Sequence, residues 1–251
     1  MEEFHSYKIK PVSTLGSGAF GYVEKIELYN SGNKLCGLYA RKVLNPQPEI
    51  LHSITLEEIK KRFIREVIYQ SKCSHGNIIY IYLFNKYAEN PYYIMELGES
   101  DLDGEINKNV LSEREKINII IMLLNATKKI HDEGYLHRDI KPKNVLKFPN
   151  NVYKLSDFGL VKNIDENNQT TALTAIGSIM GTRKYMAPEI HIEAEYSRQT
   201  DIYALGIVFK DLNIECAKLR EVIDKCTRRD KDQRYCIIDD VLNDVYQNIN
   251  S

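Results

Sequence analysis

The spacing of apolar residues changes at one place, near Gly98, and this change constrains the fold more than any other feature of the sequence. Before that point, short runs alternate apolar and polar residues between Gly, Asn and Pro, which is typical of β-strands. After it, apolar residues recur at helical spacing. The sequence therefore predicts an α+β chain with a small β-rich lobe over residues 1–97 and a larger helical lobe over residues 98–251.

One main helix is expected in the first lobe. A capping box, Thr55-Leu-Glu-Glu58, marks its start, because Thr and Glu three positions apart can each bond the other's backbone N–H group. The apolar side chains that follow fall on one face of this helix: Leu56, Ile59, Phe63 and Val67.

The second lobe is expected to contain a longer helix that a second capping box starts at Ser112 and that ends near Glu133, before Gly134. Residues 163–180 are polar and show no periodicity, so a mobile loop is expected there. Three further helices are expected at about 200–212, 215–227 and 237–249.

Composition excludes several classes of protein. Hydrophobic residues make up 43% of the 251 positions, and 34 Lys and Arg balance 35 Asp and Glu, so nothing favours binding to nucleic acid or membranes. The N-terminus lacks a signal region, and the most apolar run, residues 117–124, is too short to span a bilayer. The five cysteines include no C-x-x-C pair, which favours reduced, mostly buried thiols in a cytoplasmic protein.

Residues 16–23, GSGAFGYV, form a glycine-rich turn between two expected strands. G-x-G-x-x-G alone is a weak signal, because such turns are common, and its position between strands disfavours a Rossmann dinucleotide site. Glycines allow backbone N–H groups to approach phosphates where side chains would collide. Lys42 lies on the strand that follows; it is either a solvated surface residue or a phosphate ligand, and a buried lysine would need a counter-charge such as Glu66.

Residues 136–146, LHRDIKPKNVL, place one acid among several bases between apolar ends. Asp139 could accept a proton from an attacking hydroxyl, and Lys141 could neutralise charge on a transferred group. Asn144 offers a neutral oxygen, and Asp157 begins a DFG tripeptide 18 positions after Asp139. An Asp and an Asn that converge near phosphates suit Mg²⁺.

Taken together and in this order, these segments resemble the signature of the eukaryotic-type protein kinase family, serine/threonine class. The resemblance runs from about Tyr7 to Tyr246. It also rests on HGNII (75–79), GTRKYMAPE (181–189), DIYALG (201–206) and Arg234. It implies a bilobal protein-kinase fold in which residues 1–251 form a single catalytic domain, and transfer of the γ-phosphoryl group of ATP to protein hydroxyls.

The resemblance also implies roles for individual residues. Lys42 would hold the α- and β-phosphates of ATP and pair with Glu66, and Asp139 would be the catalytic base, with Lys141 and Thr182 close to it. Asn144 and Asp157 would hold two Mg²⁺ ions. The remaining ATP-binding residues would be Leu15, Gly16, Gly18, Gly21, Val23, Ala40, Met95, Glu96, Leu97 and Leu146, with Met95 as gatekeeper and the backbone of Glu96 and Leu97 bonded to adenine.

Other positions carry implied roles in architecture. His137 would pack against Phe158, Asp201 would brace the catalytic loop, and Glu189 would pair with Arg234. Lys141 indicates the serine/threonine class. Arg138 indicates control by phosphorylation of the activation loop. The candidate acceptors are Thr170, Thr171, Thr174 and Ser178, and autophosphorylation is predicted at Ser178 or Thr174.

Three features depart from the family pattern. Asp201 and Arg234 are only 33 positions apart, so a segment that often docks substrates is shortened between about 212 and 226, and a partner could cover the gap. Gln70 stands where an apolar residue is usual, either because the helix register is shifted or because the active conformation is marginal. Four basic side chains, Lys141, Lys143, Arg183 and Lys184, indicate either solvated surface charge or a groove for substrates with acidic residues near the acceptor.

Two other functions stay open. A pseudokinase or scaffold would predict the loss of Lys42, Asp139, Asn144 or Asp157, and all four are present. A small-molecule kinase of related fold is disfavoured by Thr182 and by Ala-Pro-Glu at 187–189, although the shortened segment leaves room for it. The expected partners are therefore a protein substrate and ATP, with a regulatory partner possible.

Overall fold

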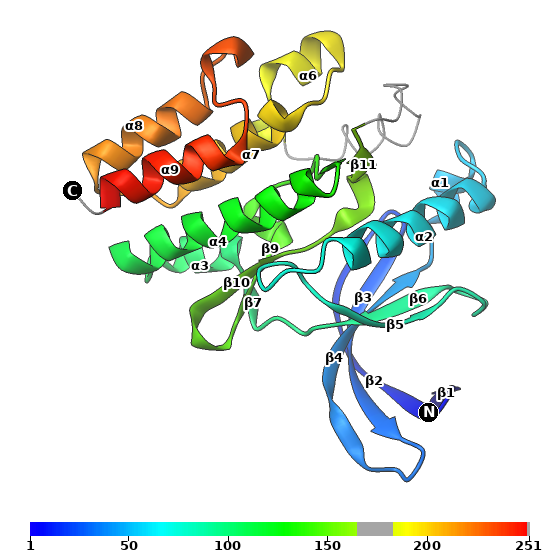
Figure 1. The fold of residues 1–251 in the computed structure, drawn as a ribbon. Coiled ribbons are helices and arrows are strands. Elements are labelled where there is room, and N and C mark those ends of the chain that lie inside the picture. The colour runs from blue at the N-terminus through cyan, green and yellow to red at the C-terminus, as the bar shows by residue number, and fades with distance from the viewer. Residues whose placement is uncertain (165–182, 250–251) are drawn as a thin grey trace. The chain divides into compact units, whose positions relative to one another are not determined.

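The computed structural model describes residues 1–164 and 183–249 (Figure 1). This part of the chain packs as two compact units, one of Met1–Ser71 with Ile79–Gly98 and the other of Lys72–Ile78 with the described residues from Glu99 onward. Of the loop expected at 163–180, Asn163 ends a short strand, and residues 165–180 lie outside the described residues.

The first unit is built on a six-stranded antiparallel sheet in the order β1-β2-β3-β4-β6-β5. The strands are β1 (Glu2–Phe4), β2 (Tyr7–Gly18), β3 (Gly21–Asn30), β4 (Leu35–Leu44), β5 (Ile81–Asn85) and β6 (Tyr92–Met95). Branched and aromatic side chains at alternate positions fill one face of the sheet, as in strands that bury a single face. They are Ile9, Ile26, Leu28, Val43, Tyr92 and Ile94. The sequence pattern predicted the glycine-rich connection between β2 and β3 but neither β1 nor the short helix α1 (Pro48–Leu51).

Helix α2 (Leu56–Lys72) starts at the predicted capping box. Thr55 donates its backbone N–H to the Glu58 carboxylate at 3.1 Å, and the Glu58 N–H returns a bond to the Thr55 hydroxyl at 3.3 Å. The predicted apolar face buries Ile59, Phe63 and Val67, but Leu56 is 43% exposed. Leu56 is the first helical residue and precedes the first buried position of this face by almost a full turn.

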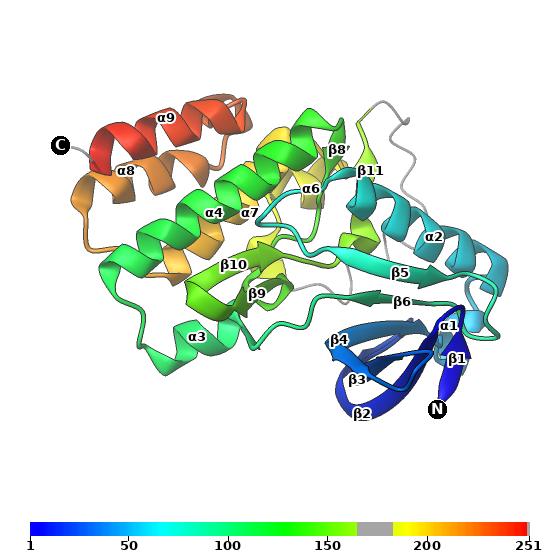
Figure 2. The same cartoon turned by 60° about the horizontal axis from the view of Figure 1, so that its bottom comes forward.

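The second unit is mainly helical and contains two small sheets, β10-β9-β7 and β11-β8. The strands are β7 (Ser100–Asp101), β8 (Tyr135–Leu136), β9 (Val145–Phe148), β10 (Val152–Leu155) and β11 (Lys162–Asn163). The helices are α3 (Leu102–Lys108), α4 (Glu113–Asp132), α6 (Pro188–Glu193), α7 (Arg198–Asp211), α8 (Ala217–Cys226) and α9 (Ile238–Ile249). Helix α4 is central, because it packs against β10, α7 and α9 (Figure 2).

The predicted helix boundaries in this unit are confirmed to within about two residues. Ser112 and Glu115 form the capping box of α4, and Gly134 follows the helix with a left-handed φ of 79°. Helices α7, α8 and α9 correspond to the three helices expected after position 200, and α3 was not predicted.

Only residues 212–216 join α7 to α8, which confirms the shortened segment. The two helices approach closely at Gly206, where an added Cβ would lie 2.8 Å from the Cβ of Cys226. The start of α4 holds the connection, because the Glu113 carboxylate accepts from the N–H groups of Glu215 at 2.7 Å and Cys216 at 3.2 Å. These two bonds fix the short connection against the start of α4.

All five cysteines are free thiols, but the expectation that most are buried was wrong. Cys73 and Cys226 are buried, whereas Cys36 and Cys236 are exposed because each lies at the edge of an element, at the start of β4 and just before α9. Within the described ranges, no helix combines the length and the apolar character needed to cross a bilayer.

Candidate active site

The glycine-rich turn joins β2 to β3, and its glycines have different reasons to be glycine. A Cβ on Gly21 would lie 2.0 Å from the carbonyl oxygen of Val43, so the packing of β3 on β4 itself excludes a side chain there. At Gly16 and Gly18 an added Cβ would meet no atom of the described chain within 4 Å. Internal packing thus requires Gly21 alone, and the open space at Gly16 and Gly18 fits a loop that a phosphate group approaches.

Lys42 and Glu66 lie together in the first unit. The Lys42 Nζ on β4 is 2.6 Å from Glu66 Oε1 on α2, and the Tyr93 hydroxyl on β6 donates to the same oxygen at 2.7 Å. Glu66 is only 5% exposed, so its charge depends on these donors. The pair combines a charge that phosphate would attract with a carboxylate that fixes its position.

The residues expected around adenine are divided between the two units. Ala40 and Met95 are buried and face each other across β4 and β6. Glu96 donates its backbone N–H to the Tyr80 carbonyl at 3.2 Å, so its expected contact with adenine cannot use that group. Val23 and Leu97 are half-buried in the first unit, Leu15 is half exposed there, and Leu146 is half-buried on β9 of the second.

The segment that follows β8 folds back on Asp139. The Lys141 ammonium lies 3.0 and 2.8 Å from the two carboxylate oxygens of Asp139. A short 3₁₀ turn, Pro142–Asn144, then returns Asn144 toward the same residue, and its amide nitrogen donates to the Asp139 side chain at 2.9 Å and to the Asp139 backbone carbonyl at 2.8 Å. Three residues predicted from one stretch of sequence therefore form one cluster.

The surroundings of Asp139 raise the pKa of its carboxyl group. Burial is the main cause, and the negative charge of Asp157 adds to it, whereas the Lys141 ammonium acts in the opposite direction. A carboxylate with a raised pKa accepts a proton more readily than an ordinary aspartate. Asp139 thus has the properties of a general base.

Asp201, at the start of α7, braces the same segment from behind. Its carboxylate accepts from the backbone N–H groups of His137 at 2.8 Å and Arg138 at 2.9 Å, and lies 2.9 Å from the His131 Nε2. These bonds hold Arg138 in a left-handed conformation with φ of 68°. Burial opposes ionisation of Asp201, but the hydrogen bond and charge of His131 prevail and lower its pKa. The predicted brace is confirmed.

Two further predictions about architecture are also confirmed. The His137 and Phe158 rings pack edge to face with centroids 5.2 Å apart, and burial lowers the pKa of the His137 imidazole, which favours its neutral form. Arg234 donates to both carboxylate oxygens of Glu189, at 2.7 and 2.9 Å, and both residues are buried. Both contacts stabilise the fold, and neither residue pair is needed as a reacting group.

Asp157 and Asn144 have the chemistry of ligands for a hard cation. Asn144 directs its amide nitrogen to Asp139, which leaves the amide oxygen as its ligand atom. Asp157 lies in a left-handed conformation, with φ of 61°, at the start of a short turn, and its charge reaches Asp139. One carboxylate and one amide oxygen suit Mg²⁺, which retains waters and binds phosphate oxygens at its other positions. The residues present therefore fit the ion.

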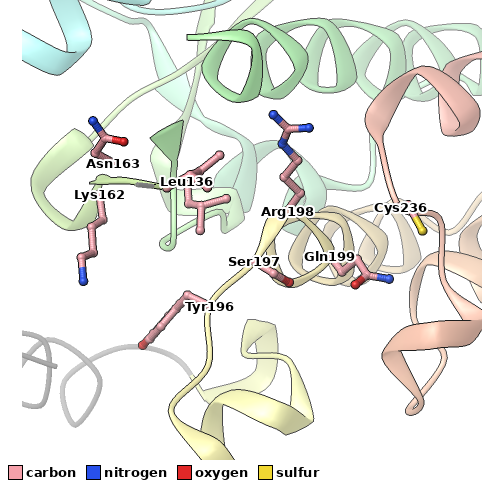
Figure 3. Close-up of a pocket in the computed structure, with 9 residues that line it drawn as sticks. Leu136, Lys162, Asn163, Tyr196, Ser197, Arg198, Gln199 and Cys236 are labelled. Carbon is pink, nitrogen blue, oxygen red and sulfur yellow. The ribbon is translucent and has the colours of Figure 1, made fainter. Parts of the chain in front are cut away.

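A hollow of about 390 Å³ lies in the second unit and is lined in part by Leu136, Lys162, Tyr196 and Arg198 (Figure 3). The Arg138 guanidinium stacks on the Tyr196 ring, 3.6 Å from its centre. The Arg138 Nε is buried and has no hydrogen-bond partner among the described residues. A cation is thus held beside the hollow with bonding capacity to spare.

Several predicted residues lie outside the described residues. They are Thr182, expected near Asp139, and the four candidate phosphorylation sites, Thr170, Thr171, Thr174 and Ser178.

Two of the four basic side chains that the sequence suggested for a substrate groove are paired with carboxylates. Lys184 bonds both carboxylate oxygens of Asp211, at 2.6 and 2.7 Å, and Lys141 is paired with Asp139, so these two charges are largely neutralised. Lys143 and Arg183 are exposed, and neither forms an ion pair within the described part of the chain.

Gln70 is buried in α2 and forms one side-chain hydrogen bond. Its Nε2 donates to the Ile79 carbonyl at 2.9 Å, while its Oε1 has no partner among the described residues. Because Glu66 faces Lys42 and Gln70, one turn later, is only 3% exposed, a shifted helix register does not explain the glutamine.

The sequence reasoning did not single out Tyr93. On strand β6, Tyr93 shares its face with Met95, two positions on. A tyrosine hydroxyl on a strand that faces the core needs a hydrogen-bond partner. This need for a partner was the signal in the sequence that could have pointed to Tyr93.

Comparisons with known proteins agree with this geometry. A family model described as the protein kinase domain matches residues 9–245. A probable serine/threonine-protein kinase PknB of Lactococcus lactis is 35% identical over 153 residues, which are 60% of this chain and 24% of that protein. A calcium/calmodulin-dependent protein kinase type 1 of Caenorhabditis briggsae is 31% identical over 201 residues, 77% of this chain and 51% of that protein.

An Aurora kinase of Eremothecium gossypii is 31% identical over 208 residues, 79% of this chain and 50% of that protein. The chain thus spans between about a quarter and a half of the length of these three relatives.

Proposed function

Because the chain belongs to the protein kinase family, we propose that it is an ATP-dependent protein kinase that phosphorylates serine and threonine hydroxyls of protein substrates. The observation that carries the proposal is the cluster in which Lys141 and Asn144 both bond the carboxylate of Asp139. Such a cluster suits phosphoryl transfer, which depends on positioning and neutralisation of charge more than on covalent chemistry.

In this mechanism Asp139 orients the substrate hydroxyl and accepts its proton as the oxygen attacks the γ-phosphorus. Its raised pKa supports this role, and Asn144 keeps the carboxylate in one orientation. Lys141 would release part of its bond to Asp139 to neutralise charge on the transferred group. Thr182 is proposed to hydrogen-bond near Asp139 in the peptide-binding loop. Lys141 supports the serine/threonine class.

The proposed nucleotide-binding residues are those that the family resemblance implies. Lys42, fixed by Glu66, would bind the α- and β-phosphates, and the turn with Gly16 and Gly18 would cover them. Mg²⁺, bound to Asn144 and Asp157, would neutralise phosphate charge. The adenine ring would contact the apolar side chains Leu15, Val23, Ala40, Met95, Leu97 and Leu146.

A phosphorylation assay tests the proposed function. The purified chain, with ATP and Mg²⁺, is expected to phosphorylate serine and threonine residues of a general acceptor such as casein, and mass spectrometry would locate them. Asp139→Asn should lower the rate about a thousandfold, because a positioned general base contributes about 10²–10⁴-fold. Asp103→Asn, on helix α3 and outside the proposed site, is a control that should leave the rate unchanged. Transfer that is equally fast in Asp139→Asn would contradict the assignment.

We also propose that phosphorylation of the activation loop raises activity. Arg138 stands beside the hollow with an Nε that has no partner among the described residues, and it could bind a phosphate there together with Lys162. Intact-mass measurement after incubation with ATP is expected to show phosphate on Thr174 or Ser178. Phosphatase treatment should then lower the activity of the wild type and have little effect on Arg138→Ala. No phosphate on residues 163–180 would contradict the proposal.

Substrate preference would follow the two basic side chains that form no ion pair within the described part of the chain. Lys143 and Arg183 are exposed, so acidic residues near the acceptor are proposed to favour binding. A positional-scanning peptide library should show this preference, and Lys143→Glu should weaken it, whereas Lys184→Ala should change it less because Asp211 already neutralises Lys184. A preference for Arg before the acceptor would contradict this proposal. The five free thiols support a cytoplasmic location.

A further inference from the structure

The Glu66 carboxylate has a second donor besides Lys42. The hydroxyl of Tyr93, on β6, donates to Glu66 Oε1 at 2.7 Å, and Lys42 Nζ lies 2.6 Å from the same oxygen. Tyr93 is 1% exposed, and its ring packs on Phe63 of α2 with centroids 5.3 Å apart. All four residues belong to the first unit, so this contact does not depend on the second.

Tyr93 is well placed to fix the orientation of the carboxylate. Strand β6 pairs with β4 on one side and β5 on the other, so the backbone that carries Tyr93 is held from both edges. A phenol that donates to a carboxylate forms a charge-assisted hydrogen bond, which is stronger than a neutral one. The hydroxyl therefore ties α2 to a rigid strand through the same oxygen that pairs with Lys42.

A second hydrogen bond holds α2 one turn later. Gln70 Nε2 donates to the Ile79 carbonyl at 2.9 Å, just before β5. Helix α2 is thus bonded at Glu66 to strand β6 and at Gln70 to the segment just before β5, both times by buried polar groups.

We propose that Tyr93 is a positioning residue for the phosphoryl-transfer reaction: its hydroxyl holds Glu66 in the orientation that pairs with Lys42, from within the first unit. The proposal rests on the proposed kinase function. It adds that the Lys42–Glu66 pair is set by the sheet itself, before any phosphate is bound by Arg138.

Replacement of Tyr93 by phenylalanine isolates the hydroxyl, because the ring can keep its contact with Phe63. Tyr93→Phe is expected to lower kcat/KM for ATP about tenfold, since a hydrogen bond to a charged group is lost. In a Glu66→Ala background the same change should lower kcat/KM less than twofold, because the oxygen that the hydroxyl bonds is already absent. A general structural defect would lower it equally in both backgrounds.

Tyr92→Phe is the matched control. Tyr92 is the adjacent residue and is also buried, at 2% exposed, but it points to the opposite face of β6, where its hydroxyl accepts from Asn85 Nδ2 at 3.4 Å. It should leave kcat/KM unchanged. Thermal unfolding of each variant would show that the fraction of folded protein is the same.

A readout that does not require catalysis separates this proposal from the proposed function. Amide hydrogen exchange over α2 should be faster in Tyr93→Phe than in the wild type, and unchanged in Tyr92→Phe. Equal exchange over α2 in the two variants would overturn the proposal even if the wild type transferred no phosphate. An equal loss of kcat/KM in the wild-type and Glu66→Ala backgrounds, or no loss in the wild-type background, would overturn it as well.

Discussion

Asp139 lies in the short segment that Asp201 braces, and the surroundings of the two carboxylates differ. Asp201, 1% exposed, accepts from two backbone N–H groups and lies against His131, and its pKa is lowered. Asp139 has a side chain 17% exposed and accepts from two side chains, Lys141 and Asn144, and its pKa is raised. Donors fixed by the backbone make a carboxylate structural, whereas burial beside another negative charge prepares one to accept a proton.

The largest expected effect on stability concerns the buried ion pair between Glu189 and Arg234. Glu189→Gln should lower the free energy of unfolding by about 3–5 kcal/mol, because it leaves the Arg234 guanidinium, whose side chain is 0% exposed, without its counter-charge. Glu66→Gln, at the Lys42 side chain that is 25% exposed, should cost less stability and more activity. Urea unfolding and initial rates would be measured for both variants. Equal losses of stability in Glu189→Gln and Glu66→Gln would contradict the expected difference between the two ion pairs.

The two aspartates should also respond to pH in opposite directions. Both have an ordinary pKa of 3.8. Because the pKa of Asp139 is raised in the folded state, its ionisation destabilises the fold at neutral pH, and this cost disappears as the pH falls through the raised pKa. Asp201 stabilises the fold above 3.8, and that contribution is lost as the pH falls through its lowered pKa.

Rates and unfolding measured against pH test this difference. The rate should fall with acidification at a pH above 3.8, as Asp139 takes up its proton, while the fold is still intact. Unfolding of Asp139→Asn should lack the penalty at neutral pH. A rate that falls only together with unfolding would show that the two carboxylates are not separated in this way.

The smallest effect is expected at Gln70. Gln70→Leu removes the bond to the Ile79 carbonyl but also removes the unpaired Oε1, so the free energy of unfolding should change by no more than about 1 kcal/mol. Basal activity should not rise, because Tyr93 still bonds Glu66. A rise in basal activity would show instead that the glutamine keeps the active conformation marginal.

Much of the fold could be predicted because local signals agreed with tertiary structure. The capping boxes at Thr55 and Ser112 start helices as predicted, and the glycine-rich segment joins two paired strands. Strand β1 could not be predicted, because three residues carry too little pattern. Its position depends on distant contacts, such as the Phe4 ring against the Tyr92 ring.

The candidate site divides in the same way. Asp139, Lys141 and Asn144 are close in sequence, so their cluster followed from a single segment. The neutralisation of Lys184 by Asp211 and the bond between Tyr93 and Glu66 join positions 27 residues apart, and such pairings appear only once the chain is folded.

A parallel measurement on Asp139→Asn and Asp201→Asn tests the central claim most directly. The rate of phosphoryl transfer and the free energy of unfolding would be measured for both variants in the same buffer. Asp139→Asn is expected to lose about a thousandfold in rate with unfolding unchanged within about 1 kcal/mol. Asp201→Asn is expected to lose about 3 kcal/mol of stability, because two backbone donors and His131 lose a charged acceptor. Comparable losses of stability in the two variants, or an active Asp139→Asn, would contradict the account.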